Sequence, residues 1–330
     1  MSDRVSICAV IQNDGKMLAQ GLLFAASLRK HGNDKFDVFL CCPKNSDKWS
    51  MDVEVTDPEV LSYFEKIGVK VNFFDNAAFG SAYPHSNKAY AFATLPASQP
   101  FIFFDTDYLF LDDLSDLDFN FDNPDFIRGP RSWPPLNRSQ HSLDEIWGDI
   151  YAALGVDTAV VYRQEHKIND WERYTYFNAS LIYFKDPQQF SAIYLDNMKK
   201  IWALDTLKIP HRFLYPQLDQ IVLPATLAML GIKPKIYRFQ HKRRLRWLHY
   251  HDFPFLYYYR KDYDFIGYVR TLLEEDLTLA GILRGIPEFS HYFSAEADSA
   301  LRKESCLWEG DVNLRHIKDD LLAKGHWYQG

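Results

Sequence analysis

Short apolar runs alternate with segments of helical periodicity along the first part of the chain. An apolar run at 5–11 leads into a turn at Asn13, Asp14 and Gly15, after which apolar side chains recur at helical spacing. The predicted strands of this half are 5–11, 36–42, 69–74 and 101–104, and the predicted helices are 17–30, 58–67 and 86–95. Such alternation predicts an α/β fold with a mixed, mainly parallel sheet flanked by helices.

The second half of the chain alternates less regularly. Its predicted elements are strands at 179–184 and 235–239 and helices at 187–203 and 218–230. Beyond Phe255 the chain becomes aromatic and then helical, which predicts a mostly helical extension at 256–330 packed on a domain formed by 1–255. No repeat, low-complexity tract or Gly/Ser linker divides the chain further.

Composition and charge exclude several classes of protein. The 330 residues are 47% hydrophobic and 25% charged, which is enough to bury a large core. The formal net charge of -7 would repel a polyanion, so we expect no nucleic-acid partner. The four cysteines lack the C-x-x-C spacing of a zinc clamp or redox motif. The first apolar stretch is too short to cross a bilayer, and we expect a cytoplasmic protein without a transmembrane segment.

The apolar run FIFF ends on two carboxylates, Asp105 and Asp107, with Thr106 between them. In open α/β sheets, ligands bind beyond the carboxyl ends of the strands. Residues i and i+2 of a strand point the same way, so strand geometry here would direct both carboxylates at one cation. Mg²⁺ and Mn²⁺ take a few protein carboxylates and fill their other positions with phosphate and water. The pair predicts a metal-held phosphate ester; the alternative is two solvated acids at a strand end.

A strand that ends in D-x-D is also typical of phosphatases of the haloacid-dehalogenase kind, in which the first Asp, here Asp105, would be the nucleophile. Those enzymes carry the motif on their first strand, with Thr or Val two residues after the second Asp. In this chain three predicted strand–helix units come first, and Leu109 holds that position. The phosphatase is therefore the second hypothesis.

The segment FIFFDTDYLFLDDLSDL resembles the D-x-D segment of GT-A fold glycosyltransferases, in particular the retaining family that includes glycogenin and bacterial lipopolysaccharide galactosyltransferases. Other segments lie along the chain in the order that this family would require. Before the D-x-D segment these are AASLRKHG and SNKAYAFATL, and after it TYFNASLIYF, LDQIVL and RWLHYHDFPF. The resemblance covers roughly residues 5–255. It implies a Rossmann-like GT-A domain at 1–255 that binds a nucleotide sugar and carries the catalytic site.

By this resemblance, Asp105, Asp107 and His249 would bind Mn²⁺ or Mg²⁺ together with the diphosphate of a nucleotide sugar. His251 is a rival of His249, because a strand would put both on the same side. The residues that the resemblance assigns to the nucleotide sugar are Asp105, Lys88 and Asn13. A solvated helix lysine is the alternative role for Lys88.

Around the transferred sugar, the resemblance implies catalytic roles for Gln220, Asp219 and Asn178. Carboxylate and amide oxygens there would stabilise an oxocarbenium-like transition state, with Gln220 against the far face of the sugar. Asp219 is also compatible with the role of a helix N-terminal acid. The chain departs from the family where Ser180 replaces a Gly, which would narrow the sugar pocket, and where DFPFLYYY follows the late His instead of Gly and K-P-W.

Aromatic residues are concentrated between the D-x-D segment and Asn178, where they would form either core or a sugar-stacking acceptor site. They are Trp133, Trp147, Tyr151, Tyr162, Trp171, Tyr174 and Tyr176.

Together these observations predict a metal-dependent glycosyltransferase that moves a hexose from a nucleotide diphosphate sugar, with a UDP-sugar favoured, and retains the configuration at the anomeric carbon. The sequence does not say whether the acceptor is a glycan, a lipid-linked group or a protein. Two alternatives stay open. One is the phosphatase with Asp105 as nucleophile, and the other is a relative that binds a nucleotide sugar without catalysis.

Overall fold

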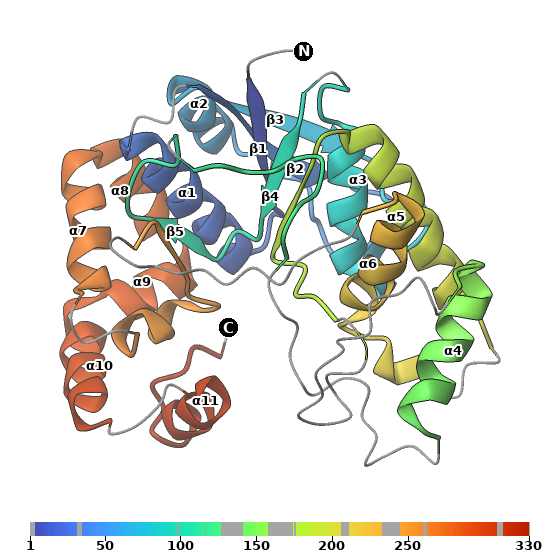
Figure 1. Cartoon of the computed structure of the whole chain (residues 1–330). Helices are drawn as coiled ribbons and strands as arrows, with labels where there is room; N and C mark the ends of the chain where they lie inside the picture. Colours follow the sequence, from blue (N-terminus) through green and yellow to red (C-terminus); the bar gives the residue numbers. More distant parts are fainter. Residues whose placement is uncertain are drawn as a thin grey trace.

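The computed structural model describes residues 4–31, 35–97, 99–115, 117–126, 141–157, 174, 176–205, 211–232, 245–259, 263–308 and 313–329. Within them, a five-stranded sheet runs through the middle of the molecule (Figure 1). Its strands, in spatial order, are β3 (Val69–Phe74), β2 (Phe36–Pro43), β1 (Val5–Val10), β4 (Phe101–Phe104) and β6 (Leu181–Phe184). The first four are parallel to one another, and β6 is antiparallel to β4. The predicted α/β class with a mainly parallel sheet is confirmed.

Helices cover both faces of this sheet, as Figure 1 shows. On one face lie α1 (Gly15–Lys30) and α2 (Pro58–Lys66), and on the other lie α3 (Asn87–Ala93), α4 (Leu143–Leu154), α5 (Pro187–Trp202) and α6 (Leu218–Met229). Successive side chains of β1 alternate between the two sides, so Ile7 and Ala9 join one hydrophobic core while Cys8 and Val10 join the other. This two-sided burial explains why the strands are almost entirely apolar.

Two short strands outside the main sheet were not predicted. They are β5 (Tyr108–Phe110) and β7 (Trp247–His249), which pair antiparallel so that Tyr108 lies opposite His249. The pairing joins the segment after the D-x-D motif to a segment late in the chain. Helix α4 was also not predicted, and the predicted strand at 235–239 lies outside the described residues.

The late part of the chain is helical, as expected from its sequence. It contains α7 (Phe265–Glu275), α8 (Leu277–Arg284), α9 (Pro287–Phe293), α10 (Ala295–Leu307) and α11 (Leu314–Ala323). Short 3₁₀ helices are η1 (Gly80–Ala82), η2 (Pro84–Ser86), η5 (His211–Phe213) and η6 (Phe253–Tyr257). Buried side chains of α7 to α11 belong to the same core as α1 and α2. The division of the chain at residue 255 into two domains stays a prediction.

Among the described residues, no helix combines the length and the apolar character needed to cross a membrane.

Candidate active site

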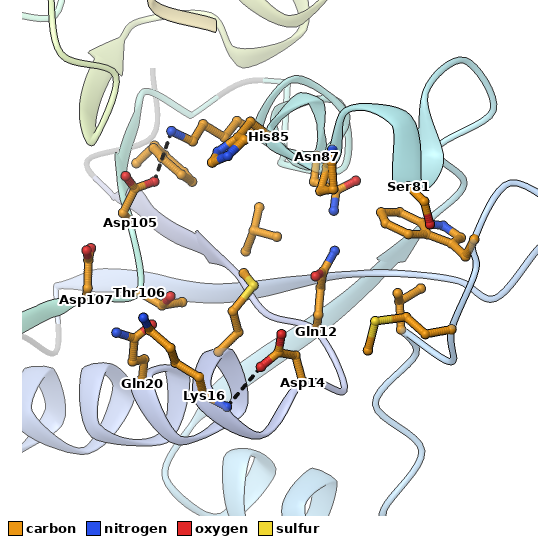
Figure 2. A pocket seen from close by; sticks show the side chains of 18 of the residues that line it. Gln12, Asp14, Lys16, Gln20, Ser81, His85, Asn87, Asp105, Thr106 and Asp107 are labelled. Atoms are coloured by element: carbon orange, nitrogen blue, oxygen red, sulfur yellow. Dashed lines mark hydrogen bonds and ion pairs between the residues drawn. The ribbon is translucent and has the colours of Figure 1, made fainter. Parts of the chain in front are cut away.

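A cavity of about 510 Å³ lies beyond the carboxyl ends of β1 and β4. From β1 the chain continues to β2 and β3 on one side, whereas β4 lies on the other side, so the strand order reverses between β1 and β4. Ligands of open α/β sheets bind at such a reversal. Figure 2 shows Gln12 and Asp14, which follow β1, facing the cavity together with Asp105 and Asp107, which follow β4. The D-x-D segment therefore lies where the sequence predicted a ligand site.

Three groups at one end of the cavity could hold a metal ion. A ligand atom from each of Asp107, His249 and His251 lies within 4.8 Å of the others. Asp107 Oδ2 is 3.1 Å from His249 Nε2 and 3.9 Å from His251 Nδ1. Asp107 Oδ1 is buried and has no hydrogen-bond partner among the described residues. One free carboxylate oxygen beside two imidazoles fits a divalent transition metal such as Mn²⁺, whose other positions would take phosphate oxygens and water.

The pairing of β5 with β7 brings these groups together. The imidazole of His249 stacks on the ring of Tyr108, with centroids 4.5 Å apart, and the backbone N–H of Tyr250 donates to the carbonyl of Asp107 at 2.9 Å. Two steps beyond His249, His251 has a φ of 63°, which is uncommon for a residue with a Cβ. Its carbonyl accepts from Gln20 of α1 at 3.4 Å. The surrounding chain thus holds a strained conformation that directs His251 to the cavity.

The ionisable groups at this end of the cavity shift one another's pKa. Burial alone would lower the pKa of His249, but the adjacent Asp107 carboxylate outweighs it and raises that pKa. Burial would raise the pKa of Asp107, and the two histidines reverse that effect so that its pKa is lowered. For His251, burial and then the charge of His249 lower the pKa to about 4. At neutral pH His251 is neutral, as a metal ligand must be.

Asp105 belongs to a different set of contacts from Asp107. The two aspartates lie in the turn between β4 and β5, so the strand geometry expected for them does not apply. Lys88 Nζ is 3.1 Å from Asp105 Oδ1 and 2.9 Å from Asp219 Oδ2. Partial burial raises the pKa of Asp105, although Lys88 opposes this effect. Burial would lower the pKa of Lys88, but its two carboxylate partners raise it, so Lys88 is a buried cation and not a solvated helix lysine.

Asp219 has no carboxylate oxygen left for a ligand. Besides Lys88 on Oδ2, the hydroxyl of Tyr83 donates to its Oδ1 at 3.0 Å, and its backbone N–H donates back to Tyr83 at 2.8 Å. Only 1% of Asp219 is exposed. Burial would raise the pKa of Asp219, but Lys88 holds it below its ordinary value.

Other residues predicted for the site lie around the cavity without lining it. Asn178 Oδ1 accepts from the backbone N–H of Ser180 at 2.7 Å. Gln220 Oε1 is buried and has no hydrogen-bond partner among the described residues. The side chain of Ser180 contacts the Tyr108 hydroxyl at 2.9 Å. Asn13 is exposed, and its neighbours in sequence line the cavity in its place. Their roles toward a sugar or nucleotide stay predictions.

The aromatic residues before Asn178 are mostly core where they are described. Trp147 and Tyr151 of α4, with Tyr174 and Tyr176, belong to the hydrophobic core on that face of the sheet. The other three aromatic residues of this group lie outside the described residues.

Several cavity residues had no sequence signal. The polar or aromatic ones include Gln12, Lys16, Gln20, Trp49, Ser81, His85 and Asn87. They come from the segments after β1 and β2, from α1, from η1 and η2, and from the start of α3. Uncharged side chains dominate this set, and an isolated amide or Trp has no diagnostic spacing. The one available clue was position, because Gln12 directly follows the first predicted strand.

Three solved glycosyltransferase structures are similar to the chain. The bifunctional glycosyltransferase WbbM is 14% identical over 67% of this chain and 38% of its own, with a TM-score of 0.38. The galactosyltransferase LgtC, solved with donor and acceptor sugar analogues, is 13% identical over 68% of this chain and 70% of its own, with a TM-score of 0.35.

GlyE of Streptococcus pneumoniae TIGR4 is 10% identical over 100% of this chain and 65% of its own, with a TM-score of 0.38. The chain thus spans less than two thirds of WbbM and of GlyE. No curated protein matches the sequence. The model of the Rhodobacterales glycosyltransferase domain matches residues 7–231, which is more than half of the chain. The chain belongs to this family and is a glycosyltransferase.

Proposed function

We propose that the protein uses Mn²⁺ or Mg²⁺ to transfer a hexose from a nucleotide diphosphate sugar, with a UDP-sugar favoured, and that the configuration at the anomeric carbon is retained. One observation carries the proposal. At the reversal of strand order, a single cavity has a candidate metal centre at one end and room for a nucleoside toward the other.

The residues of the metal end have separate tasks in this proposal. Asp107, His249 and His251 would hold the cation, which supplies Lewis-acid stabilisation of the departing diphosphate. Lys88, with its Nζ 3.1 Å from Asp105 Oδ1, would add a fixed positive charge near the leaving group. Because Asp105 is paired with Lys88, we assign it to orienting the nucleotide sugar and to the outer coordination of the cation.

Three residues near Lys88 have roles in this proposal, and two of them would contact the sugar. Gln220 keeps an unpaired buried oxygen, which suits its predicted place beside the anomeric carbon of the donor. The side-chain amide of Asn178 would contact a sugar hydroxyl. Asp219 has both oxygens engaged, and we assign it to positioning Lys88. This is a narrower role than contact with the sugar.

The alternatives differ in what they require of Asp105. A phosphatase would need this carboxylate as a free nucleophile, whereas Lys88 pairs with it at 3.1 Å. The family and the three structures named above are all glycosyltransferases, so the phosphatase has no support among them. A non-catalytic relative would bind a nucleotide sugar in the same cavity without turnover. We assign the acceptor to no class.

The test is the variant Asp107→Asn, compared with wild type in Mn²⁺-dependent hydrolysis of UDP-sugars, which needs no acceptor. We expect hydrolysis to fall by on the order of 100-fold or more, because the cation loses its charged ligand. Calorimetric titration with Mn²⁺ should show a parallel loss of affinity.

The matched control is Asp122→Asn, which removes a carboxylate that is 79% exposed and pairs with Lys185 on the surface. It should leave both measurements unchanged. Full metal-dependent hydrolysis by Asp107→Asn would contradict the proposal. A wild type that binds the nucleotide sugar and never turns it over would favour the non-catalytic alternative.

A further inference from the structure

Two buried amides face the cavity away from the metal end. Gln12 is 7% exposed and Asn87 is 2% exposed, and both line the cavity. Figure 2 shows their side chains pointing toward one another across it, Gln12 from the end of β1 and Asn87 from the start of α3. Gln12 Nε2 and Asn87 Nδ2 are both buried and have no hydrogen-bond partner among the described residues. Buried donors without partners are costly, so two of them directed into one cavity indicate a ligand that accepts from them.

The direction of the Asn87 amide is fixed by the backbone. The N–H of Phe79 donates to Asn76 Oδ1 at 3.1 Å, so this atom of Asn76 must be the oxygen. Asn76 Nδ2 therefore donates, to Ser86 Oγ at 2.9 Å and to Asn87 Oδ1 at 2.7 Å. Since the oxygen of Asn87 is engaged by Asn76, its NH₂ group is the part left for a ligand. The cavity thus offers a donor, and not an acceptor, at this position.

A loop after β2 closes the same end of the cavity. Trp49 and Met51 of this loop line it, and Trp49 Nε1 is a third buried donor without a partner among the described residues. The loop is tied to η1 by the bond from the Ser50 N–H to Ser81 Oγ at 2.8 Å and by the bond from the Ser81 N–H to the carbonyl of Lys48 at 3.0 Å. A flat ring and a thioether beside three N–H donors suit a planar heterocycle rich in carbonyl oxygens.

We propose that Gln12 and Asn87 determine the base specificity of the donor by donating to the two carbonyl oxygens of uracil. The proposal rests on the proposed function, because it takes the cation at Asp107 to hold the diphosphate and so places the nucleoside toward Trp49. Uracil carries carbonyl oxygens on both sides of its N3–H. Cytosine replaces one of them by an amino group, and an amino group facing Asn87 Nδ2 would set donor against donor.

The experiment compares two nucleotides that differ at this edge of the base. Binding of UDP and of CDP is measured by calorimetry in the presence of Mn²⁺, on the wild type and on Asn87→Asp and Gln12→Glu. We expect the wild type to bind UDP about tenfold tighter than CDP or more. Asn87→Asp keeps an oxygen for Asn76 and presents a second oxygen to the ligand, so the ratio of the two affinities should fall about tenfold or invert.

The added negative charge weakens both nucleotides alike, and the ratio cancels that effect. Thermal unfolding of each variant checks the fold, and if Asn87→Asp does not fold, Gln12→Glu and the wild-type ratio still decide. A wild type without preference for UDP, or a ratio unchanged in both variants, would overturn this inference and leave the proposed function standing. No Mn²⁺-dependent binding of either nucleotide would instead overturn the proposed function, and the inference with it.

Discussion

The two ends of the cavity hold their polar groups in opposite ways. At the metal end, carboxylates are held by imidazole or ammonium groups, as in the contacts of Asp107 with His249 and of Asp105 with Lys88. At the other end, the neutral amide of Asn87 is fixed by a backbone N–H through Asn76. The first arrangement tolerates no missing partner, because each buried charge depends on another. A neutral amide without its ligand destabilises the fold less than an unpaired buried charge does. Its NH₂ group would favour a ligand that accepts a hydrogen bond.

The largest expected effect is a loss of stability when a charge is removed near the metal end. Lys88→Met should lower the free energy of unfolding by about 3–5 kcal/mol, because the buried carboxylate of Asp219 loses its cation. Urea unfolding measures it. The control Lys200→Met removes an exposed lysine that pairs with Asp196 on α5 and should change stability by less than about 1 kcal/mol.

A double variant separates charge from packing. If the loss in Lys88→Met comes from the unpaired carboxylate, adding Asp219→Asn should restore part of the stability. No recovery in the double variant would show that the side chain of Lys88 contributes by its packing.

The next effect concerns the loop with Trp49, which lines the cavity away from the metal end. Gly80 has a φ of +52°, and a Cβ there would lie 2.2 Å from the carbonyl oxygen of Lys48. Gly80→Ala should therefore cost about 1–3 kcal/mol and displace the Trp49 loop. Nucleotide affinity should fall while Mn²⁺ binding alone is kept, both measured by calorimetry.

The control for this substitution is Gly148→Ala in α4, where nothing lies within 4 Å of the added Cβ. It should raise stability by about 0.5–1 kcal/mol because Ala favours the helix. Equal loss of Mn²⁺ and nucleotide binding in Gly80→Ala would mean that the two ends of the cavity are not independent.

The smallest effect tests the strain at His251. His251→Gly removes the Cβ from a left-handed conformation and should raise the free energy of unfolding by about 1 kcal/mol, while Mn²⁺ affinity falls about tenfold or more. His251→Ala loses the ligand and keeps the strain. The Gly variant should therefore be the more stable of the two in thermal unfolding; equal stabilities would argue against stored strain.

The parts of this molecule that the sequence predicted are those with a local pattern. The strands of the main sheet, and the helices that cover it apart from α4, follow from apolar periodicity. The position of Asp105 and Asp107 follows from the strand that precedes them. Strands β5 and β7 have only three residues each, and they exist because they pair with each other. No local sequence pattern predicts such a pair, so the turn between β4 and β5 that contains the two aspartates was missed.

Some residues of the candidate site could likewise be predicted from the sequence, and others could not. Charged candidates such as Lys88 and His249 stand out in a sequence, but the partner of Lys88, Asp219, is 131 residues away and appears only in the fold. Gln12 and Asn87 are ordinary amides. What makes them candidates is their burial without partners, which depends on the packing of β1, α3 and Asn76.

The pairing of β5 with β7 also bears on the order in which the molecule forms. Asp107 and His249 are separated by 142 residues, so they meet only after a long stretch of chain has been synthesised and its ends brought together. Contacts of such separation carry a large loop-closure entropy and form late. A cation that is held by both Asp107 and His249 cannot bind tightly when only β1 to β4 have formed a sheet. The candidate metal centre is therefore completed only when the late segment docks, and Mn²⁺ affinity would measure how much of the chain has reached its native state.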